Sequence, residues 1–180
     1  MTYTARAVAE WVLWLAAQKG RKLSPMQLQK LLYYAQGYSL GMTGEALFGD
    51  AIEAWTHGPV VPDVYRLYKR YAGNIITPPG NAEIPDEILG IIDVVVSEKS
   101  ELSAAILRND THDEDPYKTT NQGEEITTQK LEAFFVDKFW TSDEEDEYEP
   151  IFDTKEEEIR FFQESVSDEK KRALINASSK

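Results

Sequence analysis

The sequence predicts a mainly α-helical fold, a compact helical domain with a minor β element. Hydrophobic residues recur at spacings of three and four in five or six segments, which is the pattern of helices with one buried face. Only one or two short segments show the alternation of a strand. The chain has 180 residues, 42% of them hydrophobic, including 4 Trp, 9 Tyr and 7 Phe. That content is above what a disordered chain carries, so we expect one folded core.

The first predicted helix covers residues 4–18, and Gly20 is the residue expected to terminate it. Its apolar residues form one stripe at helical spacing: Val8, Trp11, Val12 and Leu15. The second helix has a clear start, with Ser24 as N-cap, Pro25 at the first helical position and Gln27 as the capping-box partner. Its core-facing residues are expected to be Leu28, Leu31, Leu32, Ala35 and Tyr38, with Gln29, Lys30 and Gln36 on other faces. These two helices are expected to pack together as the centre of the fold.

The next segments are shorter. Residues 51–55 alternate Ile52 and Ala54 against Glu53 and Trp55, which predicts a brief strand. A turn is expected at 57–59, and the block GPVVP at 58–62 is expected to form a rigid elbow into a third helix. That helix starts at Pro62, ends at Gly73 and has the stripe Val64, Leu67, Tyr68 and Tyr71. Further helices are predicted through residues 88–95, at 100–108 and at 126–140.

Charge divides the chain into two parts. Residues 1–141 carry 13 Lys and Arg against 19 Asp and Glu, a net charge of −6; residues 142–180 carry 6 against 13, a net charge of −7. The boundary is a run of acidic residues at 143–149, which repel one another and do not pack. We therefore expect a domain at 1–141, and an acidic linker with an amphipathic helical tail at 142–180. The tail's aromatic residues, Phe152, Phe161 and Phe162, imply that it docks either on its own core or on a partner.

Composition excludes several functions. The chain has no cysteine, which excludes disulfides, thiolate nucleophiles and Fe–S clusters and fits a cytoplasmic location. The net charge of −13 argues against nucleic-acid binding and against anionic membranes. No apolar stretch is long enough to span a bilayer. A basic and aromatic group on the third predicted helix, Arg66, Lys69 and Arg70 beside three tyrosines, is small against that charge and is typical of a solvated helix face.

Catalytic motifs are absent from the sequence, which has no Gly-x-Ser-x-Gly, no Gly-rich phosphate loop and no His-Glu-x-x-His. The only histidines are His57 and His112, and residues 112–115 read HDED. Adjacent acidic residues in one loop do not all turn inward, so we predict no metal and no cofactor there. The alternative hypothesis is a small hydrolase or nucleotide-binding enzyme that uses His112 and the nearby carboxylates.

Four motifs resemble the Panacea family, also called SocA-like or GepA-like. Residues 28–37 read LQKLLYYAQG, which resembles the family signature. The pairs and blocks LF at 47–48, IEAW at 52–55 and GPVVP at 58–62 follow in the family's order and spacing. Thr111-His112 with Pro116-Tyr117 resembles a later element that usually has tryptophan where Tyr117 stands. The resemblance extends over roughly residues 3–137.

The family is described as antitoxin domains, so the resemblance implies a protein that neutralises a cognate toxin by direct binding. The physical mechanism would be occlusion, in which an acidic surface steers towards a basic toxin and aromatic anchors hold it. The residues predicted to contact the partner are Tyr33, Tyr34, Tyr38, Tyr65, Phe161 and Phe162. The sequence predicts neither the toxin's identity nor the oligomeric state.

Overall fold

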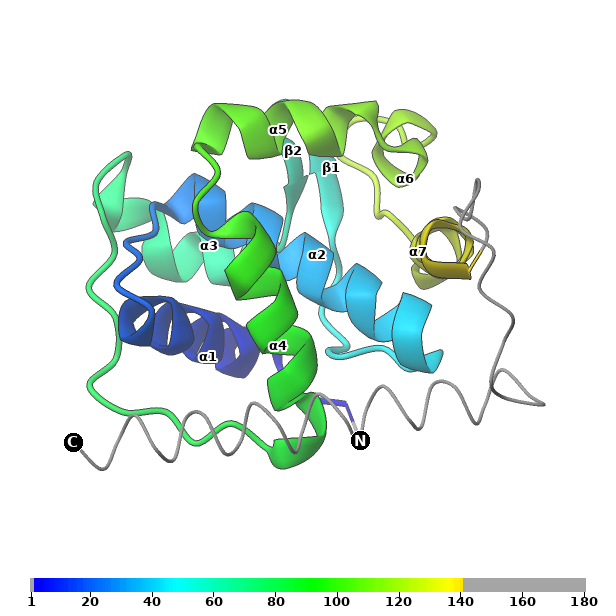
Figure 1. Ribbon diagram of the computed structural model, residues 1–180. Coiled ribbons are helices and arrows are strands. Elements are labelled where there is room, and N and C mark those ends of the chain that lie inside the picture. Colours follow the sequence, from blue (N-terminus) through cyan, green and yellow to red (C-terminus); the bar gives the residue numbers. More distant parts are fainter. Residues whose placement is uncertain (1, 141–180) are drawn as a thin grey trace.

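The computed structural model describes residues 2–140, which form seven α-helices and one two-stranded sheet (Figure 1). In chain order the elements are α1 (Ala5–Gln18), α2 (Pro25–Thr43), β1 (Glu53–Trp55), β2 (Gly58–Val60), α3 (Pro62–Tyr68) with a 3₁₀ turn η1 (Lys69–Tyr71), α4 (Asp86–Lys99), α5 (Ala104–Asp113), α6 (Asp115–Lys118) and α7 (Thr128–Trp140). The prediction of a mainly helical fold with a minor β element is confirmed. The predicted linker and tail at 142–180 lie outside the described residues.

The predicted starts of the first two helices are confirmed. The Thr4 side chain accepts a hydrogen bond from the backbone N–H of Ala7 and caps α1. Ser24 and Gln27 form the capping box of α2, which satisfies N–H groups that the first helical turn leaves without partners. Gly44 ends α2 in the left-handed conformation, with φ 71°, where an L side chain is strained.

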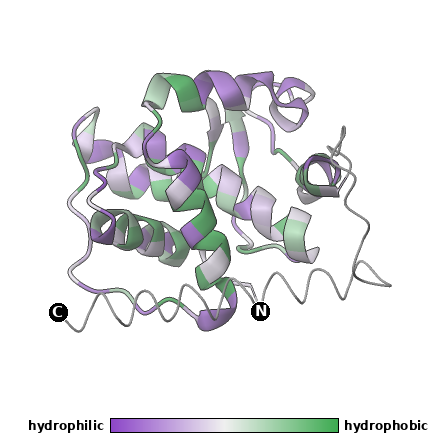
Figure 2. Cartoon of the chain, in the orientation of Figure 1, coloured by the Kyte–Doolittle hydropathy of each residue, from purple (hydrophilic) through white to green (hydrophobic). Residues whose placement is uncertain are grey.

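Helix α2 is the centre of the domain, and the other elements pack around it (Figure 1). Every residue from 28 to 41 is buried, so this helix has no solvent-facing side over that length. Figure 2 shows hydrophobic residues concentrated on α1 and α4, whereas the second half of α5 and α6 are hydrophilic. Helices α1 and α4 contact α2 and each other, and they supply a large share of the aliphatic core.

Two glycines of α2 allow α7 to pack closely against it. A Cβ atom added at Gly37 would overlap the ring of Phe135, and one at Gly41 would lie 2.7 Å from the Phe135 carbonyl oxygen. The ring of Phe135 is fully buried among tyrosines of α2. The backbone of α7 can therefore lie next to α2 because Gly37 and Gly41 have no side chains at the crossing of the two helices.

The structure corrects three element predictions. The elbow at 58–62 is partly a strand, because Gly58–Val60 pairs antiparallel with β1 in a hairpin. The third helix is shorter than predicted: α3 ends at Tyr68, the 3₁₀ turn η1 follows, and Leu67 is exposed. The helix predicted at 100–108 begins later, because Ser103 is its N-cap. None of the helices within residues 2–140 is both long and apolar enough to cross a membrane.

Candidate partner-binding site

Three polar side chains of α2 hold the segment that carries the hairpin. The Gln36 amide donates to the carbonyl oxygen of Phe48 and accepts from the Phe48 N–H, both at 3.0 Å. The Gln29 side-chain oxygen accepts from the Val61 N–H at 2.7 Å. The Lys30 ammonium donates to the Pro59 carbonyl oxygen at 2.9 Å. These side chains thus take the place of backbone partners for a segment with little regular structure of its own.

Two of these contacts hold the β2 side of the hairpin, at Pro59 and Val61, and the third holds Phe48, which precedes β1. In the β1–β2 register, Glu53 lies opposite Val60, Ala54 opposite Pro59 and Trp55 opposite Gly58. Gly58 has φ 94°, which favours glycine, and a Cβ there would lie 2.7 Å from the Lys30 Nζ. The sequence motif at 58–62 and the motif at 28–37 are therefore packed directly against each other in the structure.

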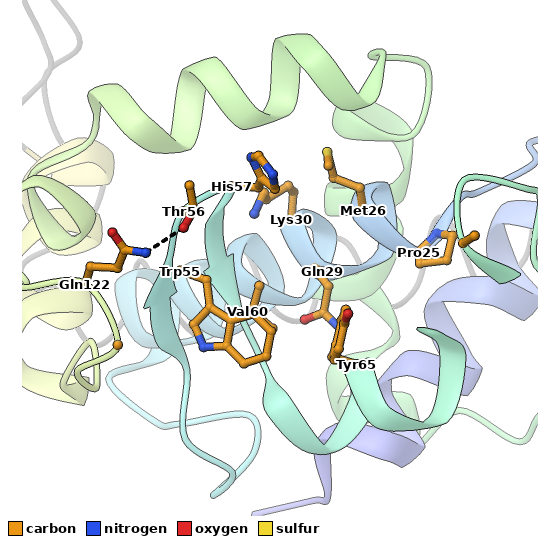
Figure 3. Close-up of a pocket in the computed structure, with 12 residues that line it drawn as sticks. Pro25, Met26, Gln29, Lys30, Trp55, Thr56, His57, Val60, Tyr65 and Gln122 are labelled. Atoms are coloured by element: carbon orange, nitrogen blue, oxygen red, sulfur yellow. Dashed lines mark hydrogen bonds between the residues drawn. The ribbon is translucent and has the colours of Figure 1, made fainter. Parts of the chain in front are cut away.

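An open cleft of about 600 Å³ lies between the hairpin, α3 and the first turns of α2 (Figure 3). Trp55 and Tyr65 meet edge to face in it, with ring centroids 5.1 Å apart. Tyr65 is 39% exposed, and the Trp55 Nε1 donates to the Glu53 carboxylate at 2.7 Å. The other lining residues are Pro25, Met26, Gln29, Lys30, Thr56, His57, Val60, Ala72, Gln122 and Gly123. We call this feature the hairpin cleft.

Lys30 is an unusual member of the cleft lining because only 1% of it is exposed. Burial, together with the nearby Arg108 guanidinium, lowers the pKa of Lys30 from 10.5 to about 7. Burial also lowers the pKa of His112, with Arg108 and Lys30 adding to that effect. Among residues 2–140, Lys30 forms no ion pair with a carboxylate. Burial in this part of the cleft lining therefore favours the neutral forms of Lys30 and His112.

The later motif, at residues 111–117, supports the hairpin from α5 and α6. The Tyr117 hydroxyl donates to the Trp55 carbonyl oxygen at 2.8 Å. The Tyr117 ring stacks on His112, with centroids 4.4 Å apart and planes 24° apart. Tyr117 thus supplies both an aromatic ring that stacks on His112 and a hydroxyl donor for the hairpin.

The HDED sequence does not assemble a metal site in the part of the chain that the structure describes. Residues 112 and 113 end α5, whereas Asp115 begins α6. The Glu114 carboxylate accepts from Lys138 at 3.2 Å and from the Tyr34 hydroxyl at 3.4 Å, so it faces α7 and α2. Within residues 2–140, no three His, Asp or Glu side chains are grouped as metal ligands.

The six residues predicted to contact a partner have different environments. Tyr33, Tyr34 and Tyr38 are 0, 1 and 3% exposed, and their rings surround Phe135 at centroid distances of 5.7, 6.3 and 5.9 Å. Burial raises the pKa of all three hydroxyls. In the free domain these rings are core residues that receive α7. Tyr65 lies on the surface, in the hairpin cleft, and Phe161 and Phe162 lie outside the described residues.

Sequence reasoning did not select Trp55, although a signal was present. The alternation at 51–55 places Trp55 on the same strand face as Glu53, opposite the core residues Ile52 and Ala54. A tryptophan on the polar face of a strand is a candidate for recognition, because large aromatic side chains are enriched in binding surfaces. The half-buried Trp55 and the exposed Tyr65 together are the aromatic pair of the cleft.

Comparison with known proteins identifies the family of this chain. The model of the antitoxin SocA-like Panacea domain matches residues 28–118, about half of the chain. Antitoxin SocA of Caulobacter vibrioides (strain NA1000 / CB15N) is 40% identical over 93 residues, which are 52% of this chain and 48% of that protein. The chain thus spans about half the length of the curated relative that it matches. No solved structure matches. The matched residues include the polar contacts of α2, the hairpin and α3, and the chain belongs to the antitoxin SocA-like Panacea domain family.

Proposed function

We propose that this chain neutralises a cognate protein toxin by binding it directly, with the hairpin cleft as part of the contact surface. Membership of an antitoxin family supports the role. The observation that carries the proposal is the way in which α2 holds the hairpin: Gln29 and Lys30 fix the backbone that positions Trp55 and Tyr65. Both the holding residues and the aromatic pair lie within the segment matched by the family.

Trp55 and Tyr65 are suited to protein binding for an energetic reason, because the backbone that carries them is already held in place. Ordering side chains and loops on association costs free energy, and a surface that is already ordered avoids part of that cost. Tryptophan and tyrosine in a partly covered pocket are also the residues in which binding free energy concentrates. Trp55 and Tyr65 have both properties, since their backbone is held from behind and their rings contact each other.

Charge gives the long-range part of the mechanism. The net charge of −13 steers the chain towards a basic partner and repels nucleic acid, so toxins with basic faces fit best. Tyr33, Tyr34 and Tyr38 contribute by fixing α2 and α7, whereas Phe161 and Phe162 are proposed to add anchors from the tail. The same balance, with no cysteine in the chain, fits action in the cytoplasm.

Co-expression tests the proposal. A gene adjacent to this one is expected to encode a small protein that stops growth when expressed alone, and co-expression of this chain is expected to restore growth through a complex that a pull-down recovers. Deleting residues 142–180 divides the contribution of the core from that of the tail. If Phe161 and Phe162 anchor the toxin, the truncated chain stays folded but rescue weakens. The absence of a toxic neighbour, together with no physical association, would falsify the antitoxin proposal.

A further inference from the structure

The aromatic pair of the hairpin cleft leaves room for a side chain of a partner. The residue paired with Trp55 across the hairpin is Gly58, which has no side chain to cover the indole, and Gly123 lines the same cleft. Tyr65 meets the indole edge to face and is 39% exposed. Figure 3 shows both rings in the cleft between the hairpin and α3. Aromatic faces in this setting attract flat and cationic groups.

A carboxylate touches the same indole. Glu53 and Trp55 lie on one face of β1, and the Trp55 Nε1 donates to the Glu53 carboxylate at 2.7 Å. This hydrogen bond orients the ring and places a negative charge at its edge. Among residues 2–140, Glu53 forms no ion pair with a basic side chain. The cleft therefore combines an aromatic wall with a carboxylate that has capacity for a further donor.

Glu125 lies directly across from Glu53 on the neighbouring segment. The two residues form an antiparallel bridge, flanked by backbone hydrogen bonds from the N–H groups of Ala54 and Ile126 at 2.9 and 2.7 Å. This pattern is that of a non-hydrogen-bonded pair, in which the two side chains share a face and lie closest together. Like charges opposite each other destabilise a sheet. A positively charged partner would remove that repulsion.

Three basic side chains on the elements around the cleft are engaged with other groups. Lys30 of α2 donates to a backbone carbonyl oxygen, and its pKa is lowered to about 7, so at higher pH it is largely neutral. Arg66 of α3 pairs with Asp63. Arg70 of η1 lies over the Tyr71 ring, 5.3 Å from its centroid. None of these three forms an ion pair with Glu53 or its neighbour across the bridge in the described part of the chain.

We propose that the hairpin cleft takes an arginine side chain of the partner, with its guanidinium against Trp55 and Tyr65 and paired with Glu53 and Glu125. Arginine fits better than lysine, because a planar guanidinium stacks on aromatic faces and donates two parallel N–H groups to a carboxylate. The inference rests on the proposed function for the identity of the partner, since a basic toxin presents such side chains. It adds the chemical group by which the cleft recognises that toxin.

N-acetyl-arginine amide tests the subsite on the full 180-residue chain alone, at about pH 8, where Lys30 is largely neutral. The readout is the indole N–H resonance of Trp55 in the NMR spectrum, which Trp55→Phe identifies by its loss. This resonance should shift to saturation with a dissociation constant on the order of 10 mM, as for a single charge-assisted contact. N-acetyl-citrulline amide has nearly the same shape but an uncharged urea group, so it should bind about tenfold more weakly.

Paired substitutions show whether the two glutamates hold the guanidinium. Glu53→Gln with Glu125→Gln, the site variant, removes both charges but keeps an oxygen acceptor for the Trp55 indole. The matched control is Glu83→Gln with Glu132→Gln, because both residues are exposed elsewhere and the two double variants have the same net charge. The site variant should bind the arginine derivative about tenfold more weakly, and the control should change binding less than about twofold. The urea midpoint of the site variant should be no lower than that of the control, because a repulsion is removed.

Binding of the two double variants to the toxin recovered by co-expression separates this inference from the antitoxin proposal. The site variant should bind that toxin about tenfold more weakly than the control does. Equal affinity for the toxin would overturn the arginine subsite and leave the antitoxin proposal intact. The subsite would also be overturned by equal binding of the citrulline derivative, by a lower urea midpoint in the site variant, or by no saturable shift up to about 50 mM. A chain that binds the arginine derivative but associates with no toxin would contradict the antitoxin proposal alone.

Discussion

The buried lysine of α2 gives a prediction about stability that can be worked out in size. Lys30→Met keeps an unbranched apolar stem of similar length in the core and removes the titrating group. In the folded protein the pKa of Lys30 is lowered to about 7, whereas in the unfolded chain it returns to its ordinary value of 10.5. Between these values the unfolded state binds more protons than the folded state. The free energy of unfolding therefore rises with pH in this interval.

The expected effect is a difference between two pH dependences. From pH 7 to pH 9, titration of Lys30 should add about 2 kcal/mol to the free energy of unfolding of the unmodified chain. The Met variant lacks that gain, while all other groups titrate in both proteins and largely cancel. Below about pH 6 Lys30 is charged in both states, so the two curves should run parallel there.

Urea unfolding at pH 5, 7 and 9, followed by circular dichroism, measures this difference. A constant offset between the two proteins at all three values would refute the reasoning, because it would mean that Lys30 keeps an ordinary pKa in the fold. An offset that changes in the opposite direction would imply a carboxylate partner for Lys30. The loss of the hydrogen bond to Pro59 adds an offset of about 1 kcal/mol that does not depend on pH.

Three further predictions concern packing and chemistry. Gly37→Ala should lower the free energy of unfolding, measured in urea, by about 1 to 3 kcal/mol, because a Cβ atom there overlaps the Phe135 ring. Gly73→Ala is the control: a Cβ atom at Gly73 meets open space, so the change should be less than about 1 kcal/mol. Equal effects of the two substitutions would contradict the close approach of α2 and α7. Leu31→Ala should cost about 2 to 5 kcal/mol by leaving a cavity in the core, and a cost near zero would contradict its burial. His112→Ala should cost about 1 kcal/mol of stacking on Tyr117 and leave growth rescue unchanged. Lost rescue in folded His112→Ala protein that still binds the partner would favour the enzyme alternative.

The helix starts were predictable because their signals are local. Ser24, Pro25 and Gln27 specify the beginning of α2 within four residues, and the structure contains the complete capping box. The hairpin was only half predictable. Residues 53–55 show strand alternation, but Gly58–Val60 contains a proline and a glycine, which weaken a strand pattern. That strand forms because side chains of α2 hold its backbone, which is a tertiary effect.

Hydrophobic periodicity did not predict which residues of α2 are buried. Gln29, Lys30 and Gln36 were assigned to faces other than the core-facing one, yet all three are buried. A helix surrounded on every side has no solvent face, so its polar side chains have to form hydrogen bonds inside the protein, here with backbone groups of neighbouring segments. The same reason explains why Tyr33, Tyr34 and Tyr38 are buried. Their rings would be exposed on an isolated α2, and they become core residues because α7 packs against them through Phe135.

The central claim is that the hairpin cleft binds the toxin, and the affinity of Tyr65→Ala for the purified toxin tests it most directly. Ile106→Ala is the matched control, since Ile106 is 47% exposed and Tyr65 39%. Calorimetric titration should show Tyr65→Ala weakening the complex by about tenfold or more, as for a central aromatic anchor, while Ile106→Ala changes the dissociation constant by less than about threefold. Unchanged affinity for folded Tyr65→Ala, and for Trp55→Ala beside it, would contradict the claim and place the toxin on another surface.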